Sequence, residues 1–234
     1  MYTLRVYSHY PYASKDKRDL YRRAVAFLWA FKNGRGYRHA DKHLSFTEVV
    51  MTLVERAKDC PAFRQPCVAV PVPRSGSSRP SFEPDACEYP CWELAQKLAT
   101  EFPHVQAVDV LGRSHPVARA SDTQGRVKIA AHLDSLVVNL PAELVQAKLV
   151  LVDDLITKGT QLMACYRALQ QAGHKGEVEA FCVSQTVAPN ATNEQQLPYL
   201  RHLVRWRTEW ELASRSDDQP WRVSRSWQTS TQAT

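Results

Sequence analysis

No run of apolar residues in the 234-residue sequence approaches the about eighteen that a transmembrane helix needs, so we expect no such helix. The first ten residues lack the basic and apolar regions of a secretory signal, which favours a cytoplasmic location. The sequence also contains no internal repeat and no low-complexity block. These absences point to a globular cytoplasmic protein that does not enter a membrane.

The cysteines form no C-x-x-C pair, which is the spacing that zinc ribbons favour. The sequence contains six of them, Cys60, Cys67, Cys87, Cys91, Cys165 and Cys182. Cys165 and Cys182 lie in apolar segments, where a cysteine behaves as a small hydrophobic residue. We therefore interpret the six as reduced, structural thiols. A metal site that uses Cys87 and Cys91 is the alternative.

The composition is close to that of an ordinary globular protein. Hydrophobic residues make up 44% and charged residues 23%, which suits one generous domain or one domain with appended arms. The formal net charge is +6. This surplus is compatible with a phosphate-rich ligand, with a nucleic acid or with neither, so it does not choose among them.

The chain divides into three segments. Residues 1–60 read as helical, with an amphipathic helix expected at about 15–32 and a capping box at Ser45 and Glu48 before a second helix. Residues 61–190 read as an α/β core. Residues 191–234 form a basic, tryptophan-rich segment that we expect to pack on this core.

Strands and helices alternate in the core segment. The patterns predict strands at 67–73, 105–111, 148–152 and 178–184, helices at 90–100, 126–136 and 160–171, and a polar loop at 112–125. The run at 148–152 is almost purely apolar, which is typical of a parallel strand buried on both faces. The alternation therefore predicts an α/β fold with a doubly wound, mainly parallel sheet.

The segment 149–160, LVLVDDLITKGT, has the most informative chemistry. A buried strand delivers the adjacent carboxylates Asp153 and Asp154 to its carboxyl end, where ligands of open α/β sheets bind. The loop that follows is rich in hydroxyls and glycine and leads into a helix amino terminus, which favours phosphate. Two acids beside a phosphate repel it unless they bind sugar hydroxyls or act through a cation such as Mg²⁺. A sugar phosphate satisfies this arrangement.

The same segment resembles the phosphoribosyl pyrophosphate (PRPP) signature of the type I phosphoribosyltransferases. The resemblance implies that Asp153 and Asp154 bind the ribose hydroxyls. It also implies that the 5′-phosphate is bound by Thr157, Lys158, Gly159, Thr160 and Gln161. Gln161 departs from the pattern, because many members have Thr, Ser or Ala at that position. A family-type sheet with a variable hood over the ligand is implied as well.

A second stretch, VAVPVPRSG at 68–76, resembles the Val-Pro-Val-Pro run of the ComF family of competence-associated phosphoribosyltransferase-like proteins. In type I phosphoribosyltransferases an early strand ends in a loop that holds the pyrophosphate, which implies this role for Arg74, Ser75 and Gly76. The stretch 111–128 resembles the mobile loop, which implies that it closes over the pyrophosphate with Arg113, Arg126 and Lys128. The ComF zinc ribbon is absent, and the helical amino-terminal segment stands in its place.

These resemblances imply a Mg²⁺-dependent phosphoribosyltransferase that transfers phosphoribose to or from a nucleobase-like or amine acceptor, with pyrophosphate as the leaving group. The residues implied in catalysis are Asp153, Asp154, Arg113 and Lys128, with Mg²⁺ carried by PRPP near the two aspartates. No general base is obvious, and we interpret His115 and His132 as ordinary surface or packing histidines. A non-catalytic protein that senses PRPP or a nucleotide is the alternative.

The carboxyl-terminal segment leaves a further alternative open. Between residues 201 and 227 it interleaves four tryptophans with six arginines. These side chains either stack on bases and contact phosphates of a nucleic acid, or pack back on the domain with the arginines turned outward; we favour packing. By family analogy alone, a homodimer is also expected.

Overall fold

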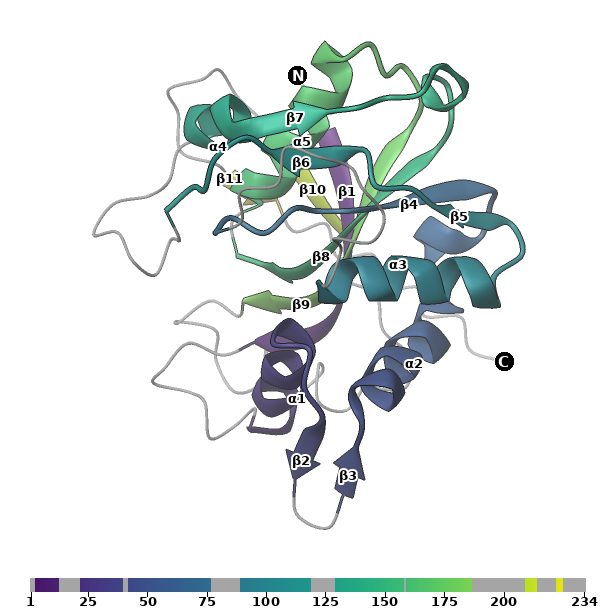
Figure 1. The fold of residues 1–234 in the computed structure, drawn as a ribbon, viewed down its shortest axis with the longest axis vertical. Coiled ribbons are helices and arrows are strands. Elements are labelled where there is room, and N and C mark those ends of the chain that lie inside the picture. Colours follow the sequence, from purple (N-terminus) through teal and green to yellow (C-terminus); the bar gives the residue numbers. More distant parts are fainter. Residues whose placement is uncertain are drawn as a thin grey trace.

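A seven-stranded sheet forms the centre of the molecule, with the strand order β11-β10-β1-β9-β8-β4-β5 (Figure 1). The computed structural model describes residues 3–12, 22–39, 42–76, 89–118, 129–157, 159–186, 209–213 and 222–224. The strands of this sheet are β1 Thr3–Tyr12, β4 Cys67–Pro71, β5 Val105–Ala107, β8 Leu149–Ile156, β9 Val178–Thr186, β10 Glu209–Ala213 and β11 Arg222–Ser224.

Five of these strands, β1, β9, β8, β4 and β5, pair in parallel, and β10 and β11 continue the sheet in antiparallel pairing beyond β1. All of β4 and the first five residues of β8 are buried. Strands that are covered on both faces need a continuous apolar run, which is what CVAVP and LVLV supply. The predicted α/β fold with a mainly parallel sheet is confirmed.

Helices cover both faces of the sheet (Figure 1). On one face, α1 Arg22–Lys32, α2 Phe46–Ala57 and α3 Pro90–Glu101 share a core with Val150 and Val152 of β8. On the other face, α5 Thr160–Gln171 packs in a second core with Leu149 and Leu151. Because successive strand residues point to opposite faces, one apolar strand serves both cores, and the sheet is doubly wound.

The smaller elements complete the two layers. The second core is also contacted by α4 Ile129–Ser135 and by an antiparallel pair of strands, β6 Leu111–Arg113 and β7 Leu136–Val138. The hairpin of β2 Tyr37–His39 and β3 Lys42–Leu44 joins α1 to α2. Two short 3₁₀ turns lie at Pro61–Phe63 and Ala142–Leu144.

Local capping explains where the predicted helices begin. The N–H of Ser45 donates to Glu48 Oε2 at 2.7 Å, and the N–H of Glu48 donates to Ser45 Oγ at 3.3 Å. These two bonds form the predicted capping box and start α2. The predicted helix at 160–171 is also confirmed, with the same bounds as α5.

The prediction that residues 1–60 are helical is wrong for the first strand. Thr3–Tyr12 forms β1, which pairs with β9 and with β10 in the middle of the sheet. Leu4 and Val6 are buried while Arg5 between them is exposed, so the segment follows the two-residue period of a strand. The helix expected at 15–32 is found as α1 from Arg22 onward, and its first residues lie outside the described ones.

The prediction of one strand at 105–111 followed by a loop at 112–125 is also corrected. The chain forms β5, breaks, and then forms β6, whose Leu111 pairs with Val138 of β7. The polar stretch hides this pairing, because a three-residue strand carries too few side chains to show a period. Residues 119–128 lie outside the described part of the chain.

The cysteines that the structure describes are consistent with structural thiols. Cys60, Cys67, Cys91, Cys165 and Cys182 are free and buried, while Cys87 lies outside the described residues. Burial raises the pKa of the Cys60 and Cys165 thiols to about 12, so both stay protonated at neutral pH.

Within the described ranges, no helix combines the length and apolar character needed to cross a membrane.

Candidate functional site

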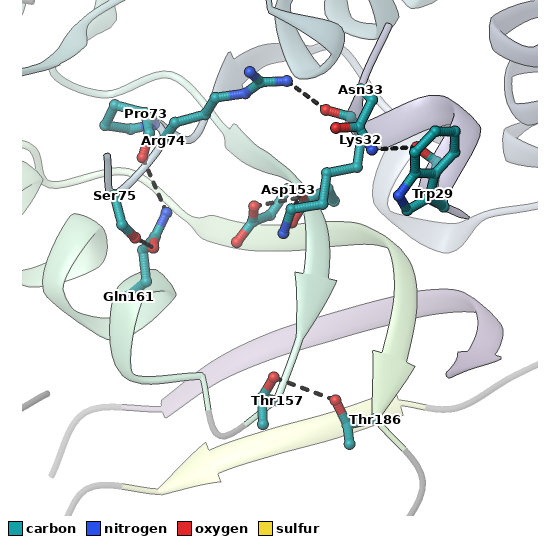
Figure 2. A network of polar contacts seen from close by, with 11 residues as sticks. Trp29, Lys32, Asn33, Pro73, Arg74, Ser75, Asp153, Thr157, Gln161 and Thr186 are labelled. Atoms are coloured by element: carbon teal, nitrogen blue, oxygen red, sulfur yellow. Dashed lines mark hydrogen bonds and ion pairs between the residues drawn. The ribbon is translucent and has the colours of Figure 1, made fainter. Parts of the chain in front are cut away.

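The two segments that the sequence analysis singled out meet at the carboxyl ends of neighbouring parallel strands. Pro71 of β4 lies opposite Val152 of β8, and the N–H of Val72 donates to the carbonyl of Val152 at 2.9 Å. This register brings Pro73, Arg74 and Ser75 beside Asp153, as Figure 2 shows. The carboxyl edge of a parallel sheet is where α/β proteins bind ligands, because connections there turn away and leave space.

A lysine contacts the acid pair directly, and a buried arginine adds a weaker electrostatic effect. The Nζ of Lys32, the last residue of α1, lies 3.1 Å from Asp154 Oδ2. On the side of α4, the guanidinium of Arg113 acts electrostatically on Asp153. The backbone N–H of Asp154 donates to Asp153 Oδ1 at 2.8 Å, which fixes the orientation of the first carboxyl group.

Asp153 is the more perturbed of the two acids. Its exposed fraction is only 8%. Burial and, second, repulsion from Asp154 raise the pKa of Asp153 to about 8, although Lys32 and Arg113 act in the opposite direction. A carboxyl group with such a pKa keeps its proton at neutral pH, so Asp153 can donate a hydrogen bond to a ligand oxygen. Strongly perturbed carboxyl groups of this kind are typical of functional sites.

The loop between β8 and α5 has the form of an anion-binding turn. Gly159 is the N-cap residue of α5, with φ 71° and ψ 9°, a left-handed conformation that favours glycine. Because the N-cap residue is glycine, no side chain from that position occupies the N–H groups of the first turn. The hydroxyl of Thr186 donates to Thr157 Oγ1 at 3.2 Å and ties the start of the loop to β9. Lys158 lies outside the described residues.

Gln161 connects this loop to the second motif. Its Nε2 donates to the carbonyl of Pro73 at 3.0 Å, and its Oε1 accepts a hydrogen bond from Ser75 Oγ at 2.7 Å (Figure 2). The shorter Thr, Ser or Ala of the family pattern could not span this distance with both contacts. The departure at Gln161 therefore has a structural use, since it joins the first turn of α5 to the Arg74 loop.

Arg74 points away from Gln161, toward α1. Its Nη2 donates to the carbonyl oxygen of Lys32, so the last turn of α1 contacts both the acid pair and the Arg74 loop (Figure 2). Ser75 is also held by its carbonyl, which accepts from the N–H of Val117 at 2.6 Å. Gly76, the third residue predicted to face pyrophosphate, is exposed at the end of this described stretch.

The prediction that Arg113 belongs to a mobile loop is wrong. Arg113 is a residue of β6 with an exposed fraction of 0%. Its guanidinium donates to the carbonyl of Pro73 at 3.4 Å and to Ser135 Oγ, and lies 3.4 Å from His132 Nδ1. Arg113 is therefore a buried residue that contacts the Arg74 loop through the Pro73 carbonyl. Arg126 and Lys128 lie outside the described residues.

The two histidines considered from the sequence occupy different surroundings. His132 is buried against Arg113, and burial together with that guanidinium lowers the pKa of His132 to about 4. A neutral imidazole can accept a hydrogen bond from Arg113, which explains how the pair is accommodated. His115 is half-exposed and lies 3.6 Å from Asp134. Both histidines are packing or surface residues, as interpreted from the sequence.

Lys32 was missed from the sequence. It lies in an amphipathic helix far from both motifs along the chain, and no local pattern marks a lysine at a helix end as a ligand-site residue. The available signal was its position in the last turn of α1, where cations are favoured by the helix dipole, but this explains a lysine without any site.

No protein-family model matches the sequence, and no curated protein matches it. Among solved structures, a hypoxanthine phosphoribosyltransferase from Staphylococcus aureus matches with 10% identity and a TM-score of 0.32, over 72% of this chain and 76% of that one. An adenine phosphoribosyltransferase from Saccharomyces cerevisiae matches with 12% identity and a TM-score of 0.35, over 74% and 93%. One from Trypanosoma brucei matches with 13% identity and a TM-score of 0.33, over 77% and 86%.

Proposed function

We propose that this chain binds PRPP and transfers its phosphoribosyl group to or from a nucleobase-like or amine acceptor. One observation supports this most strongly: an acid pair, a glycine-capped helix start and an arginine loop converge at the carboxyl edge of β4 and β8. A phosphorylated sugar with a second phosphate group has complementary features, namely hydroxyls for the acids and two anionic ends for the loops.

Each part of the ligand has a matching part of the site. The 5′-phosphate is assigned to the first turn of α5, where Thr157, Gly159 and Thr160 border N–H groups at the positive end of the helix dipole. The ribose hydroxyls are assigned to Asp153 and Asp154. The pyrophosphate is assigned to Arg74 and its neighbours Ser75 and Gly76, and Arg74 releases the Lys32 carbonyl when it turns to this anion.

The proposed reaction is a displacement at the anomeric carbon. The bond from that carbon to the pyrophosphate oxygen breaks, and its electron pair leaves with pyrophosphate. A lone pair on the acceptor nitrogen forms the new bond, and the proton on that nitrogen passes to solvent. Arg74 stabilises the charge that grows on the leaving group, and this is the type of interaction that accelerates a reaction when it strengthens in the transition state.

Mg²⁺ fits this site as an ion carried by the ligand. Among the described residues there is no group of three or more His, Cys, Asp or Glu side chains able to hold a metal ion. Asp154, and Asp153 when it is ionised, offer carboxylate oxygens, and Mg²⁺ at phosphate sites typically takes one or two carboxylates together with substrate phosphates and waters. When bound, the ion would neutralise charge on the pyrophosphate.

Calorimetric titration of the purified protein with PRPP, with and without Mg²⁺, tests the proposal. We expect saturable binding that is tighter with Mg²⁺. Pyrophosphate release is then measured with a panel of purine, pyrimidine and amine acceptors. Binding of PRPP without release from any acceptor would favour the sensor function instead. Absence of PRPP binding in both conditions would contradict the proposal.

A further inference from the structure

The last residue of α1 places a positive charge directly at the acid pair. Lys32 Nζ lies 3.1 Å from Asp154 Oδ2, and the exposed fractions of the two side chains are 51% and 19%. Neither PRPP-type motif contains this lysine. Its backbone carbonyl is bound by Arg74, so the same residue contacts the ribose part and the pyrophosphate part of the proposed site.

The end of α1 is held firmly, which keeps the lysine in place. Phe27, Leu28 and Phe31 of α1 are buried in the core shared with Val152. Gly34 follows the helix with φ 62°, and its N–H donates to the carbonyl of Phe31 at 3.0 Å. This left-handed glycine ends the helix and satisfies a terminal carbonyl group. The lysine side chain is long and half-exposed, but the packing of α1 fixes the position of its backbone.

The charge of the site makes such a cation useful. A phosphorylated sugar is an anion, and ionised carboxylates repel it wherever the ligand does not bring a cation of its own. PRPP carries a pyrophosphate that can bring Mg²⁺. Ribose 5-phosphate, which is the part that PRPP shares with a nucleoside monophosphate, lacks that pyrophosphate. For this part of the ligand, the charge of Asp154 must be offset by the protein.

We propose that Lys32 determines the metal requirement of the site, by offsetting the charge of Asp154 so that the ribose 5-phosphate part of the ligand binds without a divalent cation. The inference rests on the proposed PRPP-binding function and adds a specificity-determining residue to it. It explains why the cation at the acids comes from a helix end outside both motifs. The lysine contributes little to folding, because ion pairs with a half-exposed partner are screened by water.

The test is titration with ribose 5-phosphate, in EDTA and in Mg²⁺. We expect the unchanged protein to bind equally in both conditions. Lys32→Ala should bind about tenfold more weakly in EDTA, because the repulsion by Asp154 is no longer offset, and Mg²⁺ should restore most of the loss. Combining Lys32→Ala with Asp154→Asn should remove the dependence on Mg²⁺, since the repulsive charge is gone.

Lys58→Ala is the matched control. Lys58 is also 51% exposed and also pairs with an acid, Glu55, but it lies at the end of α2. The Lys58→Ala substitution removes the same charge, and it should leave the affinity for ribose 5-phosphate unchanged in EDTA and in Mg²⁺. Equal weakening of Lys32→Ala in EDTA and Mg²⁺, or no weakening in either, would overturn the role of Lys32 alone. If the unchanged protein binds PRPP but not ribose 5-phosphate, the Lys32 inference fails while the proposed function stands; if it binds neither, both fail.

Discussion

The two sides of the acid pair are built in different ways. On one side, residues 153–161 form one continuous segment that contains the acids, the phosphate loop and the first turn of α5. On the other side, Lys32, Arg74 and Arg113 come from α1, the loop after β4, and β6. The continuous segment supplies the groups that we propose bind a sugar phosphate. The assembled side supplies cations that the long-range fold brings to those groups.

The difference predicts different consequences of mutation. Changes in the continuous segment should act on ligand binding first, because its polar groups are the ones that we propose contact the ligand. Changes in the assembled side should act through charge, through the orientation of the Arg74 loop, or through stability where the side chain is buried. The following experiments test this contrast.

The largest effect on ligand binding is expected from Asp153→Asn combined with Asp154→Asn. Loss of the two carboxyl groups that are proposed to bind the ribose hydroxyls should weaken PRPP binding by about 100-fold or more. The fold should be retained, which thermal unfolding followed by circular dichroism will check. Asp59→Asn with Asp134→Asn, at two exposed positions outside the site, is the control with the same pair of substitutions. Unchanged affinity in the first double variant would refute the site assignment.

A large pH-dependent effect is expected from Asp153 alone. Folding raises the pKa of Asp153 from an ordinary 3.8 to about 8, so the folded chain keeps a proton that the unfolded chain releases. The contribution to stability is therefore fully present below about pH 4 and is lost as the pH rises to about 8. Asp153→Asn should be more stable than the unchanged protein at pH 8, by up to about 5 kcal/mol, and by less than about 1 kcal/mol at pH 4.

Urea unfolding across this pH range measures the effect. A constant difference between Asp153→Asn and the unchanged protein at all pH values would show that burial does not perturb the carboxyl group. The comparison is made with the single variant, so that the charge of Asp154 is kept. A gain in stability together with a loss of PRPP binding would mark Asp153 as a residue retained for function.

The opposite slope is expected from His132, on the assembled side. Burial and Arg113 lower its pKa to about 4 from an ordinary 6.5, so the unfolded chain binds a proton that the folded chain does not. Stability should be lost as the pH falls from about 6.5 to about 4, by on the order of 2 kcal/mol. His132→Gln should reduce this slope. Urea unfolding at pH 7 and pH 4.5 measures this change in stability for His132→Gln and for the unchanged protein. Equal changes in the two proteins would contradict the lowered pKa of His132.

A smaller effect is expected from Gln161→Ala. This change removes the two hydrogen bonds that join α5 to Pro73 and Ser75, so the Arg74 loop should lose its preferred position and PRPP should bind about three- to tenfold more weakly. Ribose 5-phosphate should be less affected, since it does not reach that loop. Gln170→Ala, on the same helix and bonded to Tyr166, is the matched control. Similar losses for both variants would indicate a general effect on α5.

Much of the continuous segment was predictable because its signals are local. The run LVLV predicts a buried strand, the apolar period of residues 160–171 predicts α5, and the acids and glycine lie between them in order. By contrast, β1 was taken for part of a helical segment, although Leu4 and Val6 follow the period of a strand. Its pairing with β9 involves residues more than 170 positions apart, as the hydrogen bond from Tyr7 to Glu179 shows.

The burial of Arg113 also depends on contacts between remote segments, so the sequence did not predict it. A charged residue in a polar stretch favours an exposed loop, because burial of a charge without partners is costly. In the structure, the Pro73 carbonyl, Ser135 and the neutral ring of His132 supply those partners, and they come from the loop after β4 and from α4. The groups that compensate for the buried charge of Arg113 come from segments that are remote along the chain, and the local pattern contains no information on them.

The amino-acid sequence was sufficient for the α/β class, for the parallel strand that carries Asp153 and Asp154, and for the glycine-containing turn before α5, because each depends on the period and chemistry of neighbouring residues. Only the tertiary structure showed the ion pair of Lys32 with Asp154, the link from Gln161 to the Arg74 loop, and the burial that changes Asp153. These features depend on distances between segments that are remote along the chain. Electrostatic energy follows distance in space and exposure to water, which the order of residues does not specify.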